Sequence, residues 1–220
     1  MIRNIIFDFV GVIADIDYKT ILSKLSFKEK IQALRLFVTF KTNKNAKAVF
    51  DSYQCGEFST EELDEIVTEK YPKSKGLITK LSALVVENMS INKSVLNLID
   101  SIRKDKFNVY MLSNSTPETL KVMEKYNILS HFDDAILSTE INLTKPNRNI
   151  YEYTAKRFNI DPNNTFYVDD NDANLGMADW LGFKILACKN SNQAFHEVGH
   201  RFYCDYHIFE DKNEEEQSKE

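Results

Sequence analysis

The feature that most constrains the fold is a short apolar run, Ile5-Ile6-Phe7, that stops at Asp8. A continuous apolar run of this length is typical of a strand buried on both faces of a parallel sheet. The pattern returns at 107–112, 165–168 and 183–187, which end at Ser113-Asn114, Asp169-Asp170 and Cys188-Lys189. Helix-like segments follow the first three runs. Strands that alternate with helices predict an α/β fold with a doubly wound, Rossmann-like parallel sheet.

Polar side chains therefore gather at one edge of the predicted sheet, because parallel strands present their carboxyl ends together and ligands bind beyond those ends. Asp8, held at the end of a buried strand, is placed as a nucleophile must be for in-line attack. The adjacent carboxylates Asp169 and Asp170 are costly to bury near a third one unless a cation neutralises them. A hard divalent ion such as Mg²⁺ suits these oxygen ligands. A solvated acidic turn suits Asp133-Asp134 better.

Residues 18–92 have helical spacing of their apolar side chains and no convincing strand. Ser59 or Thr60 is a candidate N-cap there, and Glu62 would complete a capping box on Ser59. Phe37 and Phe40 have the spacing of core residues on one helix. We therefore predict an α/β core at 1–17 and 93–209, an inserted all-helical cap at 18–92, and a flexible acidic tail at 210–220.

Composition excludes several other classes of protein. The net charge is −5 and no block of Lys or Arg stands out, which argues against a nucleic-acid partner. The apolar start of the chain is short and interrupted by Asp8, unlike a signal peptide or a membrane span. Three widely spaced cysteines favour reduced thiols. His196 and His200 are four apart, but no third metal ligand accompanies them. We predict a cytoplasmic protein without a membrane partner, and make no prediction of oligomeric state.

Four motifs in order resemble the haloacid dehalogenase (HAD) superfamily. They are NIIFDFVGVIAD (4–15), LSNS (112–115), Lys145-Pro146 before a helix, and YVDDNDANLGMADWLG (167–182). The branch that they resemble carries a helical cap and includes sugar-phosphate phosphatases. The resemblance implies a hydrolase whose nucleophile is Asp8 and whose substrate is a small phosphorylated metabolite.

The resemblance also implies the roles of the remaining site residues. Lys145 would balance the charges of Asp8, the acidic pair and a phosphate, while Ser113 and the amide of Asn114 would donate to phosphoryl oxygens. The Mg²⁺ ligands would be carboxylates and one main-chain carbonyl, namely those of Asp8, Asp169, Asp170 and Val10.

Val10 departs from the family pattern, in which phosphatases carry a second Asp that protonates the leaving oxygen. The loss of such an acid typically removes about 10²–10⁴ in rate. The chain could act on esters whose leaving group needs little protonation, use Asp15 or Asp17 instead, or bind phosphate and metal with little turnover. Asp15 and Asp17 are better explained as a helix cap or as solvated residues. Haloacid dehalogenation works without that Asp and without metal, but would leave two unneutralised carboxylates beside an anionic substrate.

Overall fold

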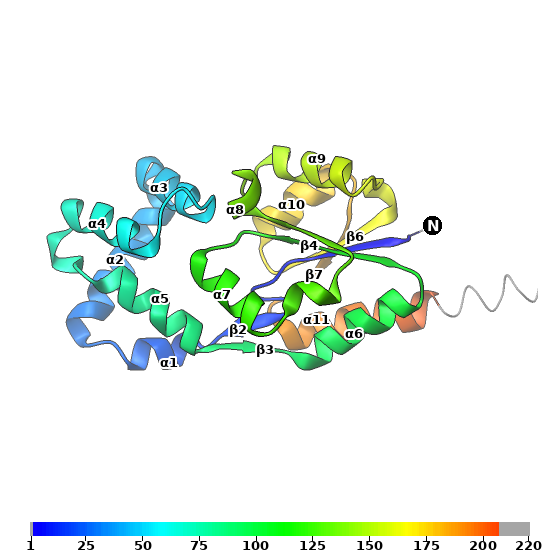
Figure 1. The fold of residues 1–220 in the computed structure, drawn as a ribbon, viewed down its shortest axis with the longest axis horizontal. Helices are drawn as coiled ribbons and strands as arrows, with labels where there is room; N and C mark the ends of the chain where they lie inside the picture. The colour runs from blue at the N-terminus through cyan, green and yellow to red at the C-terminus, as the bar shows by residue number, and fades with distance from the viewer. Residues whose placement is uncertain (1, 207–220) are drawn as a thin grey trace, which may run out of the picture.

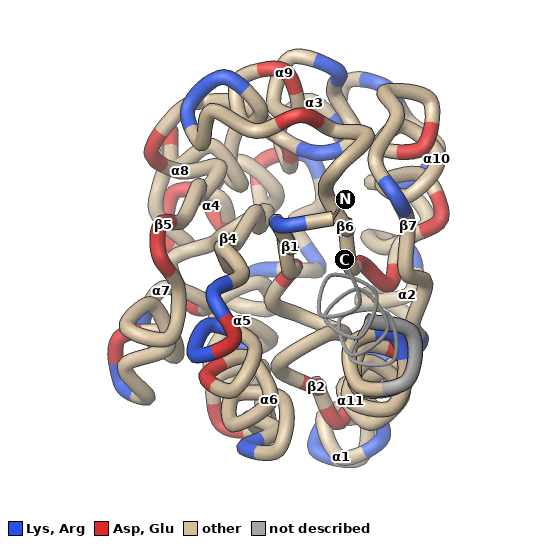
Figure 2. Tube along the Cα trace, turned by 90° about the vertical axis from the view of Figure 1, so that its right-hand side faces the viewer, with Lys and Arg blue, Asp and Glu red and all other residues tan. Residues whose placement is uncertain are grey.

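A computed structural model describes residues 2–206, so the predicted tail at 210–220 lies outside the described residues. The centre is a five-stranded sheet in the order β5-β4-β1-β6-β7, seen nearly end-on in Figure 2. Every pair of neighbours is parallel. The strands are β1 (Asn4–Phe7), β4 (Asn108–Ser113), β5 (Asp134–Leu137), β6 (Thr165–Asp169) and β7 (Lys184–Ala187).

Helices cover both faces of this sheet because successive strand residues point to opposite sides. Ile5 and Phe7 pack with α6 (Lys93–Lys104), α7 (Pro117–Lys125) and α11 (Ser191–His200). Ile6 packs on the other face with α9 (Arg148–Arg157) and α10 (Asp172–Trp180). The doubly wound α/β core predicted from the sequence is thereby confirmed. The remaining core elements are short: η2 (Ile128–His131), α8 (Ser138–Ile141), η3 (Pro162–Asn164) and η4 (Arg201–Tyr206).

A layer of helices, called the cap below, stands at one end of the core (Figure 1). It comprises α1 (Tyr18–Ser23), α2 (Phe27–Thr42), α3 (Lys44–Gln54), α4 (Thr60–Lys70), η1 (Pro72–Ser74) and α5 (Leu77–Glu87). Ser59 caps α4 and forms the expected capping box with Glu62. Phe40 packs in the cap core as predicted. Phe37 does not: its side chain is 56% exposed, because this part of α2 faces the core across a cleft rather than the cap interior.

Three strands were missed by the pattern of apolar residues. Asp134 begins β5 instead of lying in a turn, and Asp133 accepts hydrogen bonds from Arg103 and from the backbone of Val109. β2 (Ala14–Ile16) and β3 (Met89–Ile91) form an antiparallel ribbon where the chain enters and leaves the cap. Residues 89–91, predicted within the all-helical segment, are therefore extended. Strands of three or four residues are defined by their pairing and carry little periodicity of their own.

Lys and Arg positions are interspersed with Asp and Glu positions along the trace in Figure 2, and no helix or strand labelled there is coloured basic throughout. Within residues 2–206, no helix combines the length and the apolar character needed to cross a bilayer.

Candidate active site

The site is built at the carboxyl ends of three neighbouring strands. Phe7, the last residue of β1, is in register with Met111 of β4 and Val168 of β6, so Asp8 emerges between those two strands. Asp169 ends β6 and Asp170 follows it. Carboxylate oxygens of the three acids lie within 4.8 Å of one another. The fold therefore brings together the three carboxylates that the sequence predicted at this edge.

Lys145 supplies the positive charge of this cluster from the loop between α8 and α9. Its ammonium nitrogen lies 2.9 Å from Oδ2 of Asp8 and 2.8 Å from Oδ2 of Asp169. It also donates to the carbonyl oxygen of Leu112 at 3.0 Å. The side chain is buried, and each of its three donors thus has an oxygen partner.

Asp169 is the most heavily bonded carboxylate of the site. It accepts from the hydroxyl of Tyr167 at 2.6 Å, from the backbone of Asn171 at 2.8 Å and from the side-chain amide of Asn174 at 3.1 Å. These donors and Lys145 favour the ionised form. Asn174 orients this carboxylate from the first turn of α10.

The electrostatics of the cluster differ from one acid to the next. Burial, reinforced by the charge of Asp169, raises the pKa of Asp8 to about 7 despite the nearby Lys145. Burial opposes ionisation of Asp169 too, but Lys145 and the hydrogen bonds outweigh it and lower its pKa. Burial and the charge of Asp169 raise the pKa of Asp170. One ammonium among three carboxylates leaves an excess of negative charge, which suits a divalent cation with oxygen ligands.

Asn114 positions the lysine loop, a role that sequence reasoning did not assign. Its side-chain amide pairs with the backbone of Lys145 in both directions, donating to the carbonyl at 3.0 Å and accepting from the N–H at 2.8 Å. Ser113, at the end of β4, is buried beside it. Ser115 follows and is bonded to Ser138, which fixes the turn after β4 on the core. Only the serine and asparagine run after β4 hinted at these contacts.

Gly11 is a site residue whose importance the sequence did not reveal. Its φ of +83° lies in the left-handed region, which favours glycine. A Cβ at this position would collide with the carboxylate of Asp170. The turn after β1 therefore lies directly against the acidic pair only because residue 11 has no side chain.

Val10 lines the cleft beside Asp8, whereas the two acids considered as its substitutes are engaged elsewhere. Asp15 accepts hydrogen bonds from the backbone and hydroxyl of Ser191 at the start of α11. Asp17 is the N-cap of α1, as expected, and accepts from Thr20.

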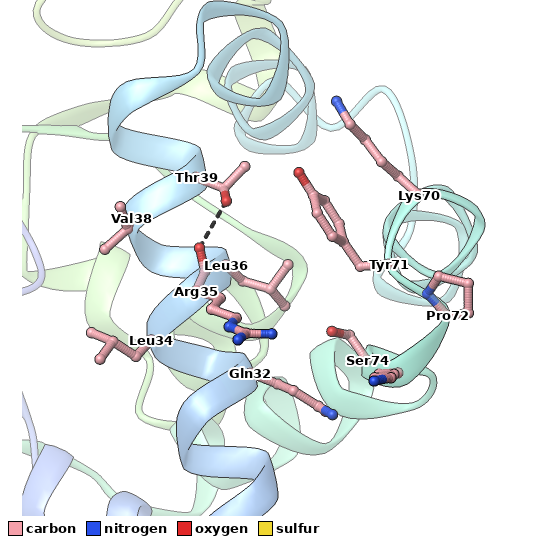
Figure 3. A pocket seen from close by; sticks show the side chains of 11 residues that line it. Gln32, Leu34, Arg35, Leu36, Val38, Thr39, Lys70, Tyr71, Pro72 and Ser74 are labelled. Carbon is pink, nitrogen blue, oxygen red and sulfur yellow. Dashed lines mark hydrogen bonds between the residues drawn. The ribbon is translucent and has the colours of Figure 1, made fainter.

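A cleft of about 650 Å³ separates this cluster from the cap. Its floor includes Asp8, Val10, Lys145 and Asp170, and its roof comes from α2, α3, α4 and α5. A second cavity, of about 680 Å³, lies between α2 and the α4–η1 segment (Figure 3). None of the strand-end residues lines that second cavity. The chemistry of the molecule is therefore assigned to the cleft between core and cap.

Comparison with known proteins agrees with this geometry. Residues 2–182 match the model of the haloacid dehalogenase-like hydrolases, and the chain belongs to that family. It is therefore a hydrolase, related to the sugar-phosphate phosphatases of the family. D-ribitol-5-phosphate phosphatase of Bacteroides thetaiotaomicron is 26% identical to it over 205 residues, covering 86% of this chain and 93% of that protein.

Two further proteins are similar to this chain. (S)-2-haloacid dehalogenase 4A of Burkholderia cepacia is 28% identical over 113 residues, but the match covers only 51% of this chain and 48% of that protein. A HAD family enzyme of B. thetaiotaomicron, solved with magnesium and inorganic phosphate, has the same fold. It superimposes with a TM-score of 0.67 at 23% identity, over 85% of this chain and 94% of that one.

Proposed function

We propose that the chain is a Mg²⁺-dependent phosphatase that hydrolyses a small phosphorylated metabolite through an aspartyl-phosphate at Asp8. The observation that carries this proposal is the cluster at the strand ends, where Asp8, Asp169 and Asp170 converge and Lys145 bridges the first two. The phosphatase among its relatives, and the related fold solved with magnesium and phosphate, support the same chemistry.

The proposed metal ligands are carboxylates of Asp8, Asp169 and Asp170 and the main-chain carbonyl of Val10. When bound, Mg²⁺ would neutralise negative charge on the phosphoryl group. The donor set consists of oxygens only, as this ion prefers.

The protein's own groups would act as follows. A carboxylate oxygen of Asp8 attacks phosphorus, and the bond from phosphorus to the ester oxygen breaks with its electron pair left on that oxygen. Lys145 balances the charge of the phosphoryl group, and the Ser113 hydroxyl and the Asn114 amide donate to its oxygens. Water then attacks the aspartyl-phosphate, which releases inorganic phosphate and restores the carboxylate.

Val10 supports a second candidate, a family member that binds phosphate and metal but turns substrates over slowly. The acidic pair argues against dehalogenation, since two carboxylates without a cation would repel a carboxylate substrate.

The test is release of inorganic phosphate from p-nitrophenyl phosphate and from a panel of sugar and polyol phosphates, with Mg²⁺ and with chelator. We expect chelator to abolish release, and Asp8→Asn to lower it by at least about a thousandfold. Asp51→Asn, on the cap helix α3 and paired with Lys47, is the matched control and should retain activity. Saturable phosphate binding without turnover would support the second candidate. Chelator-resistant release of halide from a 2-haloacid would refute both.

We also propose that the enzyme works in the cytoplasm without a nucleic-acid partner. The free, buried thiols of Cys55 and Cys188, and the mixing of basic with acidic positions along the described trace in Figure 2, support this placement.

A further inference from the structure

We propose that the substrates for which this cleft is built are phosphate esters with an apolar and acidic leaving group, that is, aryl phosphates. This inference rests on the proposed function and adds the chemical class of the leaving group. Two independent observations carry it: the lining of the roof and the side chain at position 10.

The roof above the nucleophile is mostly apolar. α2 contributes Phe37 and Phe40, α3 contributes Phe50, and α5 contributes Leu81 and Val85. The rings of Phe40 and Phe50 lie 5.4 Å apart between centroids, which forms a continuous aromatic surface. Aromatic rings pack favourably on such surfaces, beyond the gain from the area that they bury.

One cluster of polar groups on the wall of the cleft is already paired internally, and the uncharged residues Gln54 and Ser82 line the wall as well. The carboxylate of Glu118 accepts the hydroxyl of Tyr53 on one oxygen and that of Thr60 on the other, each at 2.5 Å. A polyol would have to exchange its hydration for this mainly apolar lining, and hydroxyls without partners are costly to bury. An aromatic ring loses no hydrogen bonds on entering.

The floor restricts the leaving group, because Val10 places an isopropyl group, which cannot donate a proton, in the cleft with Asp8. Among the carboxylates that line the described cleft, Asp8 and Asp170 belong to the proposed nucleophile and metal site, and Glu118 is held by two hydroxyls. Tyr18 also lines the cleft, but a phenol holds its proton up to a pH of about 10. The ammonium of Lys145 is held by Asp8, Asp169 and the carbonyl oxygen of Leu112.

The leaving oxygen must therefore depart carrying the electron pair of the broken bond to phosphorus, and take its proton from water afterwards. A phenol tolerates that charge, since it ionises at a pH of about 10 as tyrosine does. An aliphatic alcohol holds its proton far more strongly and depends on an acid catalyst. Roof and floor thus select the same kind of ester for different physical reasons.

Four phosphate compounds test separately whether the leaving group must be apolar and whether it must be acidic. Phenyl phosphate is apolar with an acidic leaving group, cyclohexyl phosphate is apolar without one, D-ribitol 5-phosphate is neither, and acetyl phosphate is small and polar with an acidic leaving group. With Mg²⁺, we expect kcat for phenyl phosphate to exceed that for cyclohexyl phosphate by about a hundredfold or more. We expect cyclohexyl phosphate to have a KM about tenfold below that of D-ribitol 5-phosphate.

Matched variants on α2 test the contribution of the roof. Phe37→Ser removes a half-exposed ring from the cleft, and we expect it to raise KM for phenyl phosphate about fivefold while sparing that for acetyl phosphate. Leu34→Ser is the control: Leu34 is similarly exposed on the same helix but does not line this cleft. Val10→Asp should narrow the difference in kcat between phenyl and cyclohexyl phosphate.

The outcomes distinguish the two proposals. If none of the four compounds releases phosphate in an Asp8-dependent way, the proposed function fails and this inference fails with it. If release depends on Asp8 but kcat/KM for D-ribitol 5-phosphate equals or exceeds that for phenyl phosphate, only the inference on the leaving group is overturned. The same holds if Phe37→Ser and Leu34→Ser have equal effects on phenyl phosphate.

Discussion

The floor and the roof of the cleft are built on opposite principles. On the floor, buried charges of the core are fixed by short contacts, such as the two from Lys145 to Asp8 and Asp169. On the roof, cap helices present apolar side chains such as Phe37, which lies partly in solvent and whose ring is contacted by the ammonium of Lys41 at 4.4 Å. On the proposed function, the strand ends would carry the reaction, whereas the helix faces would select the substrates that reach it.

The sharpest test of this contrast compares two lysines. Lys145→Met leaves Asp8 and Asp169 buried without their cation, and we expect the free energy of unfolding to fall by about 3–5 kcal/mol. Lys80→Met breaks the pair with Glu29 in the cap, at 2.7 Å but partly exposed, and should cost about 1 kcal/mol or less. Urea unfolding without metal measures both. Equal losses would show that the floor is no more tightly coupled than the cap surface.

The contact between core and cap gives the next effect in size. Glu118→Ala leaves the buried hydroxyls of Tyr53 and Thr60 without their acceptor, and we expect a loss of about 2–3 kcal/mol. Tyr53→Phe removes one donor and keeps the ring, so its cost should be about 1 kcal/mol. Chemical denaturation gives the two values, and cleavage of the cap by a protease under native conditions should accelerate more in Glu118→Ala. Unchanged cleavage would mean that Glu118 does not hold the cap to the core.

Two glycines with a positive φ, Gly76 and Gly11, allow the cost of backbone strain to be measured apart from the cost of a steric clash. Gly76→Ala, at φ +75° with open space around it, should cost about 1 kcal/mol. Gly11→Ala adds a clash with Asp170, so we expect about 2 kcal/mol. Mg²⁺ affinity, measured by titration calorimetry, should fall at least about tenfold in Gly11→Ala and stay unchanged in Gly76→Ala. A normal affinity in Gly11→Ala would place Asp170 outside the metal site.

The smallest expected effect is the dependence on pH. The pKa of Asp8 is raised from 3.8 to about 7, so the folded protein binds more protons than the unfolded chain between these values. Its stability without metal should therefore fall as pH rises through that window, by about 1 kcal/mol over its last unit, between pH 6 and 7. Asp8→Asn should remove this slope. Binding of Mg²⁺ should release protons near pH 7, which calorimetry in two buffers detects.

The sequence predicted the acidic residues of the floor because each of them follows a strand with a strong signal of its own. Asp8 and Asp169 each end a continuous apolar run. Because parallel strands have their carboxyl ends at one edge of the sheet, the two side chains were expected to lie close together. Lys145 lies in a loop and was found only through its resemblance to a family motif. Gly11 escaped because the contact that requires it, with Asp170, joins segments far apart in the chain.

The sequence predicted that the cap is helical, but it did not predict which side chains of the cap face the cleft. Helical spacing shows that Phe37 and Phe40 lie on related faces of α2, yet it cannot tell which face meets the cap interior and which meets another domain. Phe40 packs against the cap core and also lines the cleft, whereas Phe37 lies over the cleft without contacting that core. The hydrogen bonds of Glu118 could not be predicted either, since their partners Tyr53 and Thr60 belong to the cap and lie far away in the sequence.

The ribbon of β2 and β3 has a consequence for how such a chain can change. Ile16 pairs with Met89, so the 72 residues between them (17–88) leave and return at neighbouring points. A short turn joining the two strands would close the core without rearranging the sheet. The roof is thus inserted at a single point of the core, and a chain in which such a turn replaces residues 17–88 should keep the five-stranded sheet and its strand ends.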